Sequence, residues 1–543
     1  MAKPYVLTEL THSDSASPAH PCDVVVRTTE GLVAGTRHPE FAVFRGVPYA
    51  RPPLGALRFS SPLPPVAWDG VRDARRFVPP FLQPGVPESR EDALYANVWT
   101  PDVRGSRPVL VYVHGGGWQI GGGELATYDG ARPAVRGDLV VVTFNYRLGA
   151  FGFGLHEDLT DPRTGSFANW GLQDQVELLR WVRRNAAAFG GDPGNVTLSG
   201  TSAGGASAWQ LALLPQVRPL IRRIVPLSPC HVWQPAVGLT AEDSRTVYAA
   251  IARRLGTDVR GLRHVPAGAL LDAWQRVFSG SPATRLVASG REYRGPVPDG
   301  RWMRGFDHQL PAPDLPSLIV YTRTEGAFFT VPGLSALPAP PAPRDEPELR
   351  AAVRRVLEKR TPDVSDRLVD DCLTAYRQAA AAEGLPRDPL SLWTGIWGDG
   401  LFRYPIVRLA ERDAGERQPA QYLMEFAHPT RPPAFGTPHE ATSRFLFGTH
   451  GIEENAWAYG DGPSERRVCD MFIDLVASFA RDGVPSAAGV SDWPVFHPGR
   501  PTTLVLGADG TAQADGPRLA RLATTPYPRS LRFWDDVGWV PRP

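Results

Sequence analysis

A short glycine-rich stretch holds the residue best suited to nucleophilic chemistry. Gly200-Thr201-Ser202-Ala203-Gly204 has the pattern G-x-S-x-G, with β-forming residues before it and small residues after it, where a helix should start. A serine hydroxyl attacks a carbonyl well only on a tight turn beside a base, and the two glycines let a strand and a helix pass closely there. The pattern alone is also compatible with a plain glycine-rich turn. The surrounding chain must therefore decide whether Ser202 is a nucleophile.

A second glycine run lies where the donors for a developing oxyanion belong. Residues 109–113 are almost all apolar and predict a buried strand, which leads into His114-Gly115-Gly116-Gly117. Glycines expose backbone N–H groups to a reacting carbonyl, and one such donor is typically worth about 3–4 kcal/mol of barrier. This loop and the N–H of Ala203 together predict an oxyanion hole. The alternative for the loop is a flexible turn.

The acid and the base of such a site should follow later strands. Glu325 ends a predicted strand, where its carboxylate would fix the tautomer of an imidazole, although by itself it could equally be a surface glutamate in a turn. The chain has 12 histidines, and three of them follow the last predicted strands: His428, His439 and His450. Chemistry alone leaves these three unresolved as the base.

Alternating strands and helices predict the scaffold that positions these groups. Residues 139–144 read as another buried strand, and residues 172–189 have helical spacing of their apolar side chains. Strands that are apolar on both faces and alternate with helices imply an α/β fold with a mostly parallel, doubly wound sheet. The site then belongs at the C-terminal ends of the strands. The sequence from Asp23 onward is rich in β-forming residues and predicts antiparallel strands at the start of the sheet.

Length and composition bound the domain organisation. A chain of 543 residues can bury a large core. We expect residues 1–22 to form a flexible arm and residues 23–543 to form a single domain. Helical insertions, which form a cap, are expected at roughly 235–300 and 335–415.

Charge and cysteine usage exclude several classes of function. A formal net charge of +1 provides no basic stripe for nucleic acid, and no apolar run approaches the length of a membrane span. The N-terminus lacks the apolar core of a secretory signal. The 4 cysteines are scattered without metal-binding spacing and read as free thiols. We therefore expect a cytoplasmic protein, and the dominance of arginine over lysine suggests a bacterial, GC-rich genome.

Long stretches of the sequence resemble the type-B carboxylesterases, the α/β-hydrolase family that includes bacterial carboxylesterases and the cholinesterases. The matching text includes FRGVPYARPPLGALRF, EDALYANVWTP, VLVYVHGGGWQIGGG, NYRLGAFGFG and NVTLSGTSAGG. The resemblance runs from about residue 24 to the end and is weakest between 230 and 430. It implies a Ser–Glu–His triad of Ser202, Glu325 and His439, because the residues from His439 to Gly448 resemble the family's H-G-x-E-x-x-x-(V/L)-F-G context. The family's oxyanion donors correspond to Gly116, Gly117 and Ala203.

Departures from the family pattern suggest a specialised substrate. The family usually has glutamate before the serine, where this chain has Thr201. Glu440 and Thr442 stand in the histidine loop where relatives have glycine and glutamate, and residues 225–229 replace the family's Q-S-G. Ala93 stands at a family cysteine, so the usual disulfide cannot form. The partner cysteine is also missing near residues 79–82, and the short loop from there to Ala93 leaves no room for the tryptophan-bearing loop of cholinesterases, which argues against choline specificity.

These observations predict ester hydrolysis through an acyl-enzyme on a small to medium apolar ester, without metal or cofactor. The alternative is a natural-product tailoring enzyme of the same family, a deacylase, acyltransferase or cyclase, that uses the same serine and histidine. A binding module that has lost catalysis is a further alternative. We expect the protein to be a monomer or homodimer, with no nucleic-acid or membrane partner. Side chains that could line an apolar pocket, or else belong to the core, are Trp118, Thr201, Trp233, Phe328 and Phe329.

Overall fold

A computed structural model describes most of the chain. The described residues are 23–231, 239–280, 295–331, 333–334, 341–358, 361, 363–382, 384–414, 419–490, 492–507, 519–524 and 528–537. The predicted arm at 1–22 and the predicted pocket residue Trp233 lie outside these ranges.

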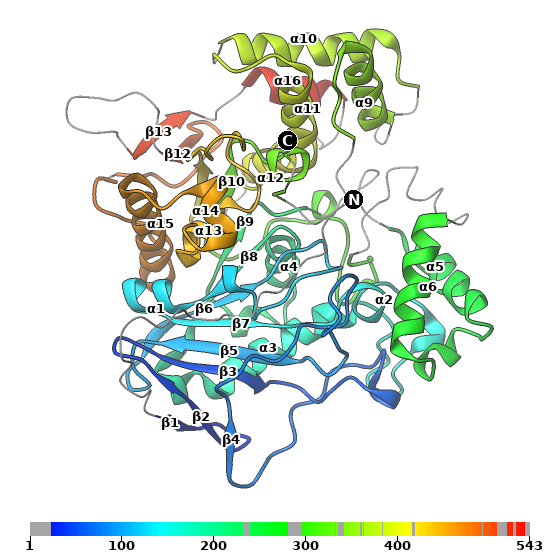
Figure 1. The fold of residues 1–543 in the computed structure, drawn as a ribbon, viewed down its shortest axis with the longest axis vertical. Helices are drawn as coiled ribbons and strands as arrows, with labels where there is room; N and C mark the ends of the chain where they lie inside the picture. The colour runs from blue at the N-terminus through cyan, green and yellow to red at the C-terminus, as the bar shows by residue number, and fades with distance from the viewer. Residues whose placement is uncertain are drawn as a thin grey trace.

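One continuous sheet carries the fold, and it has thirteen strands within the described residues (Figure 1). Their order in space is β1-β2-β3-β5-β7-β6-β8-β9-β10-β11-β12-β13, with β4 paired to β2. The strands are β1 (Asp23–Arg27), β2 (Leu32–Arg37), β3 (Ala42–Pro48), β4 (Val71–Asp73), β5 (Tyr95–Thr100), β6 (Arg107–Val113), β7 (Val140–Phe144), β8 (Gly191–Thr201), β9 (Arg223–Leu227), β10 (Ser317–Thr322), β11 (Gln421–Phe426), β12 (Thr502–Leu506) and β13 (Ala520–Thr524).

The centre of the sheet is parallel and its two edges are antiparallel. Every pairing from β7 through β6, β8, β9, β10 and β11 to β12 is parallel. The path β1-β2-β3-β5-β7 is antiparallel, as is the pairing of β12 with β13. The predicted α/β-hydrolase architecture, with antiparallel strands at the start, is confirmed. The antiparallel strand β13 is an addition that the sequence did not predict.

The apolar run of β6 follows from burial on both faces. Val109, Val111 and Val113 belong to one hydrophobic core, and Leu110 and Tyr112 belong to a second core on the other side. Side chains alternate between the faces of a strand, so a strand covered on both sides must be apolar at every position. The continuous apolar pattern thus places β6 in the middle of the sheet.

Helices cover both faces of the sheet. On one side α3 (Trp170–Asn185) and α4 (Ala203–Ala212) contact β8, and on the other α1 (Ala131–Gly137) and α15 (Pro463–Asp482) pack together against the central strands (Figure 1). The described chain also has four short helices after strands or in loops, α2 (Gly149–Gly152), α8 (Ala327–Thr330), α13 (Ala441–Phe447) and α14 (Glu453–Tyr459). The predicted helix at 172–189 is in fact α3 followed by a 3₁₀ turn at Ala186–Phe189.

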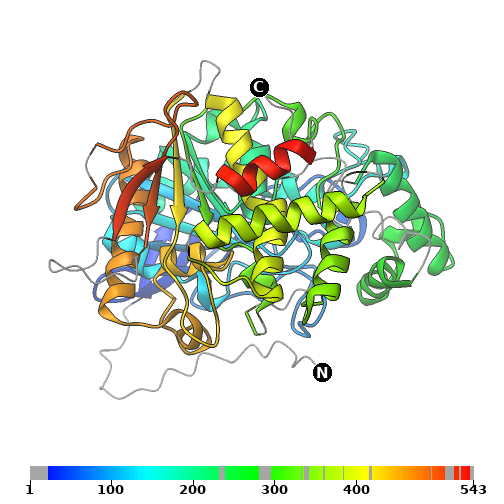
Figure 2. The same cartoon turned by 90° about the horizontal axis from the view of Figure 1, so that it is seen from above.

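Two groups of helices lie outside the sheet. The first group is α5 (Ala241–Arg254) and α6 (Ala267–Gly280), which stand apart at the right of both views (Figures 1 and 2). The second group is α9 (Glu346–Glu358), α10 (Asp366–Ala382), α11 (Pro389–Gly398) and α12 (Tyr404–Ala414). The C-terminal helix α16 (Pro528–Val537) packs alongside α10, where Trp534 Nε1 donates to Tyr376 Oη at 2.7 Å (Figure 2).

Candidate active site

Ser202 occupies a sharp turn between β8 and α4. Its backbone has φ 60° and ψ −121°, a conformation that residues other than glycine rarely adopt. A Cβ on Gly204 would lie 2.0 Å from the carbonyl oxygen of Val113, and one on Gly200 would lie 2.5 Å from the same oxygen. Both glycines are therefore required by the close passage of β8 and α4 over β6. This passage holds the Ser202 hydroxyl at the C-terminal end of the sheet.

The glycine loop after β6 presents unused backbone donors. Gly116 and Gly117 have φ of 107° and 61°, and a Cβ on Gly116 would lie 2.2 Å from the carbonyl oxygen of Ile120. Within the described chain, no hydrogen bond uses the N–H of Gly116, Gly117 or Ala203. Backbone donors left free beside a nucleophile are what an oxyanion hole requires.

Glu325 is held in place by three hydrogen bonds after β10. Its Oε1 accepts from Ser228 Oγ and from the backbone N–H of Thr322, both at 2.7 Å. Its Oε2 lies 2.6 Å from Nδ1 of His439. Because both oxygens are engaged and the side chain is buried, this carboxylate can fix the orientation and the tautomer of the imidazole.

His439 lies on the loop after β11 with its second nitrogen available. The loop is tied to the acid, because the N–H of Thr324 donates to the carbonyl oxygen of Thr437 at 3.2 Å. The buried Nε2 of His439 has no hydrogen-bond partner among the described residues. Ser202 Oγ lies 3.9 Å from Cys230 Sγ, and no hydrogen bond joins it to His439 in this state of the chain. Such contacts often tighten only when substrate is bound.

Aromatic side chains surround the imidazole of His439. The nearest ring is that of Phe402, whose centroid lies 4.2 Å away, followed by Phe329 at 5.5 Å and Phe328 at 6.0 Å. Phe402 lies on a π-helical segment, Asp399–Arg403, that joins α11 to α12. Such segments are frequent at functional sites. The segment that joins α11 to α12 therefore supplies one wall of the site.

The other predicted pocket residues lie deeper in the molecule. Trp118 is fully buried, and its Nε1 donates to Ser207 Oγ at 3.0 Å. Thr201 is also fully buried, and its Oγ1 lies 2.6 Å from the hydroxyl of Tyr112. Both side chains pack against the scaffold of the nucleophile turn, whereas Phe328 and Phe329 lie beside His439.

Three residues that sequence reasoning missed lie in the site: Ser228, Cys230 and Phe402. Ser228 holds Glu325, and the backbone N–H of Cys230 donates to the carbonyl oxygen of Ser202 at 3.2 Å. A signal existed for Ser228, because residues 225–229 depart from the family sequence, and Cys230 directly follows that stretch. Phe402 had none, since it lies where the resemblance is weakest.

Burial shifts the pKa values of two side chains in and next to the glycine loop, His114 and Glu124. It lowers the pKa of His114 to about 4, and the ring stacks on Tyr146 at 4.3 Å, so His114 is neutral at pH 7. Burial also raises the pKa of Glu124 to about 7, although the amide of Asn145 offsets part of the rise. Neither group contributes a full charge to the oxyanion loop near neutral pH.

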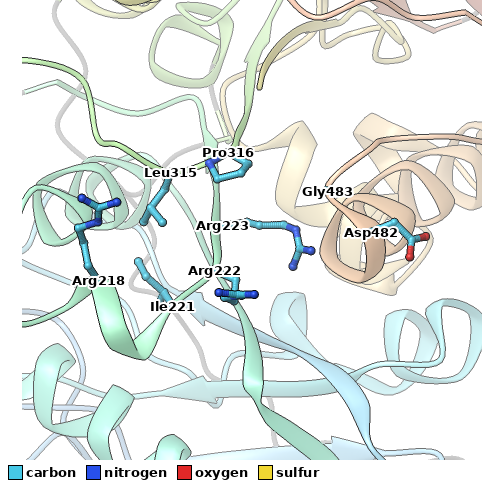
Figure 3. Close-up of a pocket in the computed structure, with 8 residues that line it drawn as sticks. All are labelled: Arg218, Ile221, Arg222, Arg223, Leu315, Pro316, Asp482 and Gly483. Atoms are coloured by element: carbon cyan, nitrogen blue, oxygen red, sulfur yellow. The ribbon is translucent and has the colours of Figure 1, made fainter. Parts of the chain in front are cut away.

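A separate cavity lies at the opposite end of the strands (Figure 3). It has a volume of about 430 Å³ and opens beside the N-terminal ends of β9 and β10. Its lining residues are Arg218, Ile221, Arg222, Arg223, Leu315, Pro316, Asp482 and Gly483. Because Ser202 follows the C-terminal end of β8, this cavity is not part of the candidate site.

Two searches over the described residues bear on other classes of function. No cluster of histidine, cysteine and acidic side chains in the described ranges could hold a metal ion. No helix there has the length and apolar character needed to cross a membrane.

Comparisons with known proteins agree with this geometry. The model of the carboxylesterase family matches residues 22–534. The phenmedipham hydrolase of Pseudarthrobacter oxydans is 33% identical over 526 residues, covering 90% of this chain and 96% of the relative. The para-nitrobenzyl esterase of Bacillus subtilis is 31% identical over 517 residues, with the same coverage of 90% and 96%.

The solved structures that resemble this chain include esterases. The carboxylesterase of Geobacillus stearothermophilus aligns with a TM-score of 0.75 at 30% identity, covering 94% of this chain and 99% of that structure. Family model, relatives and fold therefore converge. The chain belongs to the carboxylesterase family and is a carboxylesterase-type hydrolase with the α/β-hydrolase fold.

Proposed function

We propose that the protein hydrolyses small to medium apolar carboxylic esters through an acyl-enzyme on Ser202. The observation that supports this most is the pair of His439 Nδ1 and Glu325 Oε2 at 2.6 Å, with Nε2 of the same imidazole left unpaired within the described residues. Ser202 on its strained turn and the free N–H groups of Gly116, Gly117 and Ala203 complete the set of groups that acyl transfer needs.

Acylation begins when Ser202 Oγ attacks the ester carbonyl and gives its proton to His439 Nε2. The negative charge on the carbonyl oxygen is stabilised by the N–H groups of Gly116, Gly117 and Ala203. Collapse of the intermediate breaks the bond to the alcohol, which leaves with the proton from His439. Glu325 keeps the imidazole oriented and stabilises its charged form throughout.

Deacylation repeats these steps with water. The water attacks the acyl carbon as its proton passes to His439 Nε2, and the Ser202–acyl bond then breaks. The carboxylic acid leaves, and the proton returns from His439 to Ser202. No metal ion or cofactor takes part in the proposed cycle.

The aromatic rings around His439 favour an apolar substrate. Phe402, Phe329 and Phe328 offer apolar surface and no charge to a group bound beside the imidazole. A charged acyl or alcohol group would lose its hydration there without gaining a partner. We therefore expect p-nitrophenyl butyrate to be hydrolysed with a higher kcat/KM than a p-nitrophenyl hemisuccinate.

The experiment that tests this function is an ester hydrolysis assay on matched serine variants. Ser202→Ala should lower kcat for p-nitrophenyl butyrate by about 10⁶-fold, to the level of oxyanion stabilisation and binding alone. Ser478→Ala, which removes a buried hydroxyl in α15, is the control and should leave kcat unchanged. Turnover that survives in Ser202→Ala would contradict the proposal. Adding an alcohol acceptor would detect acyl transfer, the reaction of the tailoring alternative.

A further inference from the structure

A second buried carboxylate, that of Glu440, lies beside Ser202 without belonging to the triad. Glu440 directly follows His439 and is 8% exposed. A Cβ on Gly115 would lie 3.2 Å from Glu440 Oε1 and 3.3 Å from Ser202 Cβ. Glu440 Oε1 and Ser202 therefore both lie against Gly115, and a side chain at residue 115 would crowd them both.

The chain fixes one oxygen of Glu440 and leaves the other uncommitted. Oε2 accepts from Ser443 Oγ at 2.5 Å and lies 3.7 Å from Nη1 of Arg444. Arg444 is itself held by Asn455 Oδ1 at 2.9 Å. Oε1, the oxygen near Ser202, accepts no hydrogen bond from the described part of the chain. A carboxylate oxygen with free lone pairs can accept a hydrogen bond from water.

The groups on the sheet side of Glu440 are neutral. Thr201 and Tyr112 share a hydrogen bond at 2.6 Å. Burial raises the pKa of Tyr112 well above its ordinary value, and the negative charge of Glu440 adds to the rise. Because these hydroxyls stay protonated, Glu440 brings the carboxylate charge to this side of Ser202, and Arg444 balances it from the side of Oε2.

We propose that Glu440 is a positioning residue for deacylation, and this inference rests on the acyl-enzyme mechanism proposed above. Oε1 accepts a hydrogen bond from one hydrogen of the hydrolytic water. The water oxygen attacks the acyl carbon on Ser202, and its other proton passes to His439 Nε2. Acylation needs no water, so Glu440 acts in the second half of the cycle only.

The test separates the two halves by stopped-flow kinetics with p-nitrophenyl butyrate. Glu440→Gln keeps the shape of the side chain but removes its charge and one acceptor oxygen. We expect the rate of the initial p-nitrophenol burst, which reports acylation, to stay within about twofold. The steady-state rate should fall about 10- to 100-fold, the range for a misplaced reactant. A role in folding alone would lower the burst amplitude instead.

Matched variants make the outcome decisive. Glu465→Gln neutralises another glutamate that is 8% exposed and lies beside an arginine, so it should leave both rates unchanged. Ser443→Ala frees Oε2 and should slow deacylation less than Glu440→Gln. If Glu440→Gln fails to fold, Glu440→Asp is the second variant. Its shorter side chain moves the carboxylate away from the water, so it should slow deacylation and leave the rate of acylation unchanged.

Two results would overturn the proposal: a wild-type deacylation rate in Glu440→Gln, or equal losses in burst and steady state. Failure of the acyl-enzyme mechanism looks different, because wild-type Ser202 would then show no burst and no labelling by a fluorophosphonate.

Discussion

Two buried histidine–carboxylate pairs with a contact of 2.9 Å or less lie in the described part of the chain, and they are chemically alike. His439 Nδ1 lies 2.6 Å from Glu325, and His231 Nδ1 lies 2.9 Å from Asp307. All four side chains are almost fully buried. By the contact alone, either pair could be the acid and base of a catalytic triad.

Their surroundings separate them. Asp307 also accepts a hydrogen bond from Gln210, and His231 packs edge-on against Trp209 at 5.1 Å, so this pair fastens the loop after β9 to α4. The pair of His439 and Glu325 lies instead where a strained serine and free backbone donors converge. The comparison teaches that a buried histidine–carboxylate contact becomes catalytic through the groups around the second ring nitrogen.

Replacing His439 should have the largest effect. His439→Gln removes the base that takes the serine proton, so kcat/KM should fall by about 10⁴-fold or more. The measurement is hydrolysis of p-nitrophenyl butyrate, with thermal unfolding as the control for folding. A fall in kcat/KM of less than tenfold would show that His439 is not the general base.

Breaking the other pair should cost stability instead of rate. Asp307→Ala leaves His231 buried without its carboxylate, and the free energy of unfolding should fall by about 3–5 kcal/mol. Denaturant unfolding measures this change, and kcat/KM per folded molecule should stay within a few-fold of the wild type. If Asp307→Ala instead abolished activity in folded protein, the pair of His231 and Asp307 would not be purely structural, and the distinction between the two pairs would be wrong.

Glu124 extends the comparison to a buried carboxyl that belongs to neither pair. Its pKa of about 7 in the folded state lies above the ordinary 4.5, so the folded chain holds a proton that the unfolded chain releases between those values. Stability should therefore decrease as pH rises from about 4.5 to 7, by about 3 kcal/mol. Unfolding measured at pH 5 and pH 8 should show this decrease in the wild type and a smaller one in Glu124→Gln. Equal decreases would contradict the account.

Ser228→Ala is the mildest test, because it loosens the catalytic pair without removing it. Glu325 would lose one of its donors and keep the N–H of Thr322 and the contact with His439. A hydrogen bond to a charged group is worth about 1.5–3 kcal/mol, so kcat/KM should fall about 10-fold. An unchanged kcat/KM would show that Ser228 has no part in holding the acid.

Much of the fold could be predicted from the sequence because its signals are local. The apolar run of 109–113 predicts a strand buried on both faces, and β6 lies in the middle of the sheet. The outer strand β13, ARLAT, carries no such pattern, because its side chains are mostly exposed. It forms through pairing with β12, which periodicity does not reveal.

The candidate site also has parts that the sequence predicts through local patterns and parts that it does not. The turn at Ser202 and the glycine loop are encoded by short spacings, so the sequence could predict them. The contacts of Ser228 and Phe402 arise where β9 meets β10 and where a π-helical segment reaches His439. The departure at residues 225–229 marks Ser228 but not its contact with Glu325, and nothing in the sequence marks Phe402. The resemblance places Thr201 at a position that could line the pocket, whereas its hydroxyl contacts Tyr112. The roles of the triad and the oxyanion donors stay predictions until they are measured.

The most direct test of the central claim is to label the nucleophile and identify the modified residue. The folded protein would be treated with a fluorophosphonate, digested, and analysed by peptide mass spectrometry. We predict one adduct, on Ser202, and labelling about 10³-fold slower in His439→Gln, because the hydroxyl then lacks its base. Failure to label Ser202 in folded wild-type protein, or labelling at another serine instead, would contradict the account.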